Sequence, residues 1–262
     1  MNGDHVSAHL EAFEGVWEGG FYAGDPLDPT QSPFGPLGYV GVPYAIVLRC
    51  IRPYVGAETV ALEIGPGRGA YTRALLPARE LWCLDALSAE HNRFWEYVGQ
   101  RPHVHYVHVT DFSCRTLPDR GIDYVFSYDA LCHVPFEGIT AYATSLRSKL
   151  RPGAHAFWMV ADFGKYRRFL DSPTSVADAL VAEIGRPWVR RLVERVARHV
   201  EARRLERYRR HIELPQGPAG SWWYDAGAER TAEMLEALGY LVLETDVAVD
   251  PRSPIIHFQA AG

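Results

Sequence analysis

The segment that decides the fold reads VALEIGPGRG, at residues 60–69. Its first five residues form a short apolar run with the length and composition of a buried strand. The run breaks directly into three glycines at alternate positions, and residues 71–76 then have the pattern of a helix that ends near Pro77. Strand, glycine loop and helix in this order predict the first unit of a doubly wound α/β sheet.

Strands and helices keep alternating after this first unit. Further strands are expected at residues 81–84, 104–109, 124–127, 156–160, 241–243 and 255–258. Helices are expected at residues 44–51, 88–98, 139–150, 176–184 and 228–238, with a long one from Pro187 and a turn at 151–153. Seven strands in this arrangement predict a Rossmann-like, doubly wound and mostly parallel sheet, whose last two strands are antiparallel.

A chain of 262 residues fits one large domain with added segments. The cover that precedes the first strand is rich in glycine and proline but also in aromatic residues, which favours an ordered lid over a disordered tail. We therefore expect a single domain in four parts: an N-terminal cover (1–57), a core (58–162), a helical insertion or lid (163–227) and a closing helix with two strands (228–262).

The composition argues against several classes of protein. No stretch approaches the roughly 18 apolar residues of a membrane span, and the N-terminus lacks the basic-then-apolar pattern of a signal peptide. Four scattered cysteines form no CxxC pair, which argues against a zinc module and fits reduced thiols. A net charge of −5 disfavours a general nucleic-acid binder. We expect a cytoplasmic protein with no membrane partner.

The glycine loop is suited to a ligand that approaches the backbone closely. Gly65, Gly67 and Gly69 run G-x-G-x-G, which is not the G-x-G-x-x-G spacing of dinucleotide sites. Glu63 stands two positions before the first glycine, where a carboxylate would repel a phosphate. The loop therefore favours a ligand that carries an ammonium or sulfonium charge.

Acidic residues also follow the next two strands. Asp85 ends the second strand, about 20 residues after the loop, where a carboxylate can bind ribose hydroxyls. Asp111 follows the third strand, where it can accept a hydrogen bond from an adenine amino group, and Phe112 can line the ring. The pattern predicts an adenosine-containing ligand at the carboxyl edge of the sheet.

The ordered set of these motifs, with the segment 123–133, resembles the class I S-adenosylmethionine-dependent methyltransferases over about residues 58–162 and 228–260. The resemblance implies S-adenosyl-L-methionine as the cofactor, with Glu63 and the glycine backbone at its methionine moiety, Asp85 at its ribose and Asp111 at its adenine. Tyr128 completes the expected cofactor-binding set. Pro66 departs from the commoner loop and removes one N–H donor.

Methyl transfer requires the protein to align the nucleophile, to exclude water and, for a hydroxyl acceptor, to remove a proton. His133 follows the fourth strand at the ligand-binding edge, and an unperturbed histidine pKa near 6.5 suits base chemistry. Asp129 is the second candidate and Asp162 the third. A histidine that only shapes the pocket and an aspartate that only caps a turn are the alternative interpretations.

No metal site is expected. The histidines at residues 103–108 lie on a predicted strand and point to opposite faces. An alternative stays open, because some sugar methyltransferases of this superfamily use a divalent ion and Asp129, His133 and Asp162 offer suitable ligand types.

We expect the cover and the insertion to select the methyl acceptor. An acceptor pocket needs apolar walls, for which the candidates are Tyr22, Tyr39, Trp222 and Trp223. The predicted function is O- or N-methyl transfer to a small molecule, with a sugar or other natural-product scaffold as the leading expectation.

The stretch 186–210 carries ten arginines against three glutamates. Its apolar residues recur at helical spacing, so a solvated amphipathic helix is the preferred interpretation. The alternatives are an RNA or protein methyltransferase that uses this helix, or a cofactor-binding subunit without catalytic activity. The sequence is also compatible with a homodimer.

Overall fold

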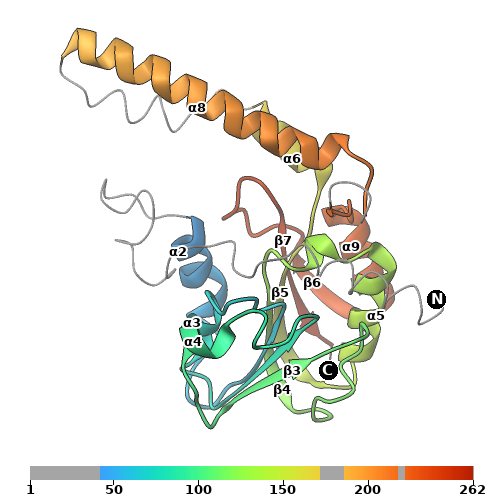
Figure 1. Ribbon diagram of the computed structural model, residues 1–262. Coiled ribbons are helices and arrows are strands. Elements are labelled where there is room, and N and C mark those ends of the chain that lie inside the picture. The colour runs from blue at the N-terminus through green and yellow to red at the C-terminus, as the bar shows by residue number, and fades with distance from the viewer. Residues whose placement is uncertain (1–41, 172–185, 218–221, 262) are drawn as a thin grey trace.

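The computed structural model describes residues 42–171, 186–217 and 222–261, and this part of the chain contains a seven-stranded sheet (Figure 1). The strands are β1 (Val60–Ile64), β2 (Glu80–Asp85), β3 (Val104–His108), β4 (Ile122–Ser127), β5 (Leu150–Met159), β6 (Tyr240–Glu244) and β7 (Ile255–Ala260). Their order across the sheet is β3-β2-β1-β4-β5-β7-β6. The first five strands are parallel, and β7 is antiparallel to both β5 and β6. This confirms the predicted fold class.

Helices cover both faces of the sheet. The helical segments are α2 (Val42–Ile46), the π-helical turn η2 (Val47–Ile51), α3 (Thr72–Leu75), α4 (Phe94–Val98), the 3₁₀ turn η3 (Leu131–His133), α5 (Phe136–Leu146), α6 (Phe163–Leu170), α8 (Pro187–Glu213) and α9 (Ala228–Ala237). In Figure 1, α2, α3 and α4 lie on one side of the sheet, and α5 and α9 lie on the other. Residues 1–41 of the predicted cover (1–57) and the predicted helix at 176–184 lie outside the described residues.

Two hydrophobic cores form on the two faces, and β1 contributes to both. All five of its residues are buried. Ala61 belongs to the core that contains Leu75 of α3, whereas Leu62 belongs to the core that contains Ile139 of α5. A strand buried on both faces has a continuous apolar run, which is the pattern that identified it in the sequence.

Two local predictions were wrong. The turn expected at 151–153 lies inside β5, because β4 pairs with Leu150 and next with His155, so the intervening residues form a bulge that includes Gly153 at φ +78°. The helix expected to begin at Ser88 begins at Phe94, because Arg93 has a left-handed φ of +52° that no helix interior allows.

The long helix predicted from Pro187 is present as α8, whose 27 residues extend over about 40 Å away from the body of the protein (Figure 1). Trp188, Leu192 and Val196 on this helix are exposed. Helix α8 is rich in charged residues. None of the helices in the described ranges is both long enough and apolar enough to cross a membrane.

Candidate functional site

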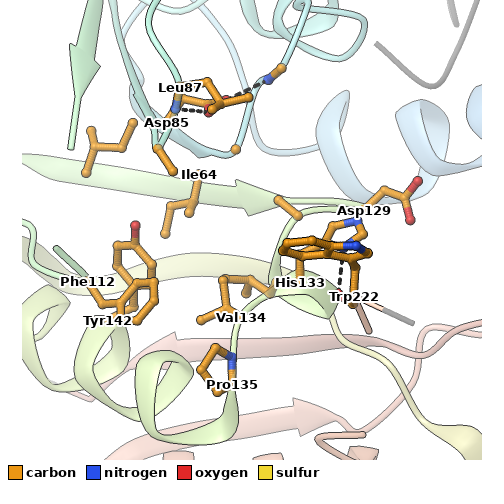
Figure 2. A pocket seen from close by; sticks show the side chains of 16 residues that line it. Ile64, Asp85, Leu87, Phe112, Asp129, His133, Val134, Pro135, Tyr142 and Trp222 are labelled. Atoms are coloured by element: carbon orange, nitrogen blue, oxygen red, sulfur yellow. Dashed lines mark hydrogen bonds between the residues drawn. The ribbon is translucent and has the colours of Figure 1, made fainter. Parts of the chain in front are cut away.

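A pocket of about 800 Å³, a volume that includes space open to solvent, lies where β1, β2 and β4 end (Figure 2). Ligands of doubly wound sheets bind at this carboxyl edge. The lining residues are Ile64, Gly65, Gly67, Leu84, Asp85, Ala86, Leu87, Phe112, Asp129, Ala130, Leu131, His133, Val134, Pro135, Tyr142 and Trp222.

The three glycines of the loop have different structural roles. Gly65 has φ +71°, and a Cβ there would lie 2.2 Å from the Cβ of Ala130, so only glycine lets the two loops meet. Gly69 lies outside the pocket lining and allows the loop to pack against α4, where an added Cβ would lie 2.3 Å from Val98. Gly67 has φ +52° and open space at its Cβ position, and it lines the pocket. The loop thus presents bare backbone to a ligand.

Asp85 joins the glycine loop to the pocket. Its Oδ2 atom accepts a hydrogen bond from the backbone N–H of Gly67 at 2.9 Å, and its Oδ1 atom accepts one from the N–H of Leu87 at 2.9 Å. Burial raises the pKa of this carboxyl, and the two backbone hydrogen bonds oppose that shift. The Asn92 side chain also donates to this carboxylate, which can accept about four hydrogen bonds, so capacity for a ligand hydroxyl is left. The geometry fits the ribose role that the resemblance implies.

Glu63 lies behind the glycine loop and is not among the pocket-lining residues. Its side chain is buried, and the hydroxyl of Thr72 donates a hydrogen bond to its Oε2 atom at 2.5 Å. Burial, together with the nearby charge of Asp85, raises the pKa of Glu63 to about 8. The role of Glu63 at the methionine moiety thus stays a prediction.

Asp111 and Phe112 have different surroundings in the structure. Asp111 lies outside the pocket lining, where Ser113 and Arg115 donate hydrogen bonds to its carboxylate. Burial alone would raise the pKa of Asp111, but these hydrogen bonds outweigh burial, so the pKa is lowered. The Phe112 ring lines the pocket and packs against Tyr142 of α5, with ring centroids 5.5 Å apart. The adenine role of Asp111 thus stays a prediction, whereas Phe112 lies where such a ring would pack.

His133 and Trp222 lie together in the pocket, away from Phe112 (Figure 2). The His133 Nδ1 atom lies 2.9 Å from the backbone oxygen of Trp222. A carbonyl oxygen only accepts hydrogen bonds, so Nδ1 carries the hydrogen and Nε2 carries the lone pair of the neutral ring. Trp223 is buried outside the pocket lining and meets the His133 ring edge-on, with centroids 6.4 Å apart.

The other predicted site residues of this region have different surroundings. Asp129 lines the pocket, and its Oδ1 atom accepts a hydrogen bond from the Arg252 guanidinium at 2.9 Å. Tyr128 is buried outside the pocket lining, and its hydroxyl donates to the Oδ2 atom of Asp250 at 2.7 Å. The acceptor candidates Tyr22 and Tyr39 lie outside the described residues.

Asp162 has a structural role. Its carboxylate caps α6 by accepting the N–H of Lys165 at 2.7 Å, and it also accepts the N–H of Ala228 at 3.1 Å. Within residues 42–171, 186–217 and 222–261, no group of three or more histidine, cysteine or carboxylate side chains is close enough to hold a metal ion.

Sequence reasoning missed several pocket residues. Leu87 follows Asp85 by two positions and had a detectable signal, because its N–H is the local donor to that carboxylate. Tyr142 is a helix residue without a motif. Arg252 is 123 residues from Asp129, and nothing local in the sequence connects the two.

Comparisons with known proteins agree with this geometry. Residues 62–158 match the family model described as a methyltransferase domain. A search of curated proteins found no match.

The solved structures that resemble this chain share its fold. The N-methyltransferase NodS from Bradyrhizobium japonicum WM9 matches with a TM-score of 0.52 and 15% identity, over 88% of this chain and 98% of that one. An S-adenosylmethionine-dependent methyltransferase from Mesorhizobium loti matches with a TM-score of 0.52 and 14% identity, over 84% and 98%. A complex of DhpI with SAH matches with a TM-score of 0.50 and 19% identity, over 99% and 95%.

The family match covers the glycine loop, Asp85 and His133. These parts of the chain lie at the pocket, at the carboxyl edge of the seven-stranded sheet. Residues 62–158 thus form a methyltransferase domain by their family match, and the chain has the fold of solved S-adenosylmethionine-dependent methyltransferases.

Proposed function

We propose that this chain is an S-adenosylmethionine-dependent methyltransferase that acts on an oxygen or nitrogen atom of a small molecule, and that the acceptor is a sugar or another natural-product scaffold. The observation that carries the proposal is one continuous pocket with two kinds of wall. Gly67, Asp85 and Phe112 line its cofactor side, and His133 and Trp222 line the side that we assign to the acceptor (Figure 2).

Bound S-adenosylmethionine supplies an electrophilic methyl carbon. On the cofactor side, the carboxylate of Asp85 would hold the ribose hydroxyls and the ring of Phe112 would pack against the adenine. The backbone of Gly65 and Gly67 would lie against the methionine moiety. Residues that hold the cofactor in this way would orient the transfer within the pocket.

We assign His133 as the general base for a hydroxyl acceptor. The hydrogen bond from Nδ1 to the Trp222 oxygen leaves Nε2 as the nitrogen that accepts the proton. Asp129 is the weaker candidate, because its carboxylate already accepts from Arg252 in a pair whose side chains are both only 12% exposed. An amine acceptor needs less help, since its neutral form is a nucleophile.

The lining of the pocket supports a small-molecule acceptor. Leu131, Val134 and Pro135 give it an apolar wall, as in other small-molecule sites. The name of NodS, an N-methyltransferase, supports nitrogen as one option. None of the pocket-lining residues comes from α8, so the RNA alternative finds no support in the pocket itself.

The test is a screen with S-adenosylmethionine that carries a labelled methyl group, run against panels of sugars, aminated natural products and an RNA pool. Mass spectrometry of the product locates the methyl group. We expect transfer to a small molecule, unchanged by a chelator, and a loss of turnover in His133→Ala without loss of cofactor affinity if the acceptor atom is oxygen. Transfer to RNA alone would contradict the proposal, and the absence of transfer to any panel would favour the non-catalytic alternative.

A further inference from the structure

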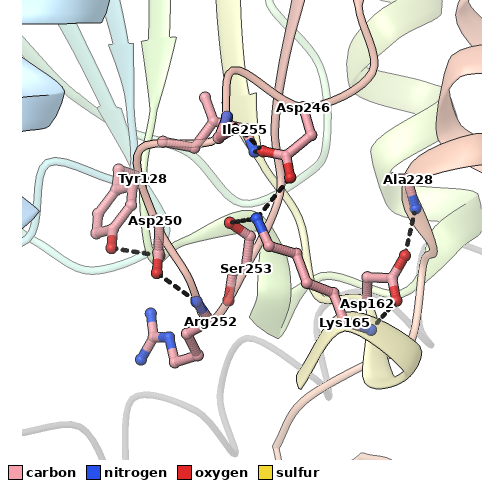
Figure 3. A network of polar contacts seen from close by, with 10 residues as sticks. Tyr128, Asp162, Lys165, Ala228, Asp246, Asp250, Arg252, Ser253 and Ile255 are labelled. Atoms are coloured by element: carbon pink, nitrogen blue, oxygen red, sulfur yellow. Dashed lines mark hydrogen bonds and ion pairs between the residues drawn. The ribbon is translucent and has the colours of Figure 1, made fainter. Parts of the chain in front are cut away.

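The loop between β6 and β7, residues 245–254, is anchored at two places (Figure 3). On one side, the Lys165 ammonium of α6 donates to Asp246 at 2.5 Å and to the backbone oxygen of Ser253 at 3.2 Å. On the other side, Asp250 accepts from the Tyr128 hydroxyl at 2.7 Å and from the N–H of Arg252 at 2.8 Å. These contacts fix the backbone from which the Arg252 side chain projects.

The Arg252 side chain touches both segments that hold His133. Its Nη2 atom lies 2.9 Å from Oδ1 of Asp129, in the turn that leads into His133. Its guanidinium carbon lies 5.1 Å from the ring centroid of Trp223, which is within the distance of a cation–π contact. His133 is held by this same second segment, through the Trp222 oxygen and the edge contact with Trp223.

The backbone is strained on each side of His133. Asp129 has φ +57° and Trp222 has φ +60°. Both values lie in the left-handed region of the backbone, which residues other than glycine rarely adopt. Such conformations persist only where the surrounding structure holds them, and they gather at functional sites. Arg252 contacts Asp129 directly and contacts the residue that follows Trp222.

We propose that Arg252 is a positioning residue for His133, because it joins the two strained segments that orient the imidazole. Arg252 also pairs with the Asp129 carboxylate. The proton-accepting role therefore belongs to His133, and Asp129 helps to hold the imidazole in position. The inference rests on the proposed function only in the role that His133 then has as the general base. The orientation of the ring is a property that can be measured without any methyl acceptor.

The experiment uses the full chain, with histidine labelled with ¹⁵N, and follows the imidazole signals by NMR from about pH 5 to 9. His133→Ala assigns the signal. In the wild-type protein we expect the neutral ring with hydrogen on Nδ1. Among the described residues, the ionisable groups near this ring include Asp129 and Cys132 of its own turn, Arg252 of the loop and Asp85 across the pocket.

Arg252→Gln removes a cation and leaves the Asp129 carboxylate without its partner. We expect the His133 titration midpoint to rise by about 0.5 to 1 pH unit and the Nδ1–H form to become a mixture of tautomers. In the double variant Arg252→Gln/Asp129→Asn the midpoint should return towards the wild-type value. The tautomers should stay mixed, because the contacts that Arg252 makes with both segments are still absent. Arg252→Lys keeps the charge and should restore the midpoint.

Lys165→Gln is the matched control, because it loosens the same loop without touching Asp129 or Trp223. It should leave both NMR readouts unchanged. The proposal is overturned if Arg252→Gln leaves the midpoint and the tautomer unchanged, or if Lys165→Gln reproduces its effects. Titration with S-adenosylhomocysteine verifies that each variant is folded, and a failed methyl-transfer screen would reject the proposed function while leaving this result intact.

Discussion

The contact between Gly65 and Ala130 gives the sharpest prediction about how the glycine loop is built. Replacing Gly65 with alanine adds a methyl group at a residue with φ +71°, and its Cβ would lie 2.2 Å from the Cβ of Ala130. Both methyl groups are attached directly to the backbone, so no side-chain rotation can separate them. One of the two loops must move.

Two terms contribute to the expected loss of stability. The left-handed backbone costs an alanine about 1–2 kcal/mol. Overpacking at a backbone-attached methyl group adds about 1–3 kcal/mol. The sum of about 2–5 kcal/mol corresponds to a fall in Tm of about 5–15 °C for a chain of this size. Gly67→Ala is the matched control, because its Cβ meets nothing within 4 Å and only the backbone term of about 1–2 kcal/mol applies.

The assay is urea and thermal unfolding of Gly65→Ala, Gly67→Ala and Gly65→Ala/Ala130→Gly. The double variant should recover most of the overpacking term, because the second methyl group is gone. Gly67→Ala should lose only the backbone term of about 1–2 kcal/mol, and it should also lose affinity for S-adenosylhomocysteine, since Gly67 lines the pocket. The reasoning is refuted if Gly65→Ala is no more destabilised than Gly67→Ala, or if Ala130→Gly brings no recovery.

Three further predictions concern charged groups. Asp85→Asn should weaken S-adenosylhomocysteine binding about 10- to 100-fold in calorimetry, because hydrogen bonds to a charged group contribute about 1.5–3 kcal/mol; unchanged affinity would remove Asp85 from the site. The folded-state pKa of Glu63 is raised to about 8, so the native state keeps a proton that the unfolded state has lost, and stability should fall by up to about 1.4 kcal/mol per pH unit from about pH 4.5 to 8. In Glu63→Gln, urea unfolding across this range should show a flatter profile, and an identical slope would argue against the buried neutral acid. Replacing Arg190, Arg191 and Arg195 of α8 with glutamine should leave methyl transfer to a small molecule unchanged, and a loss of activity would direct attention to α8 as an acceptor surface.

The part of the fold that could be predicted depends on local sequence. A strand buried on both faces has a continuous apolar run, and the glycine loop follows it within the same ten residues. Asp85 was predictable for the same reason, since it ends the neighbouring strand at the edge where β1 also ends. The bulge of β5 was missed because Gly153 resembles a turn residue until the pairing with β4 is known.

The side-chain environments could not be predicted, because they depend on tertiary contacts. Glu63 was assigned a charge that attracts a ligand, but its burial favours the neutral form, although the hydrogen bond from Thr72 opposes this effect. Asp111 has Arg115 as a partner four residues along the chain, and only the folded loop shows that the two side chains pair and that Asp111 lies outside the pocket lining. The link from Arg252 to Asp129 spans 123 residues and required the sheet to be assembled first.

The most direct test of the central claim is a crystal structure of the protein bound to S-adenosylhomocysteine. We expect ribose hydroxyls at the Asp85 carboxylate, the adenine against Phe112, and the sulfur directed towards the side of the pocket that holds His133 and Trp222. A ligand bound elsewhere, or bound here with its sulfur directed away from His133, would contradict it.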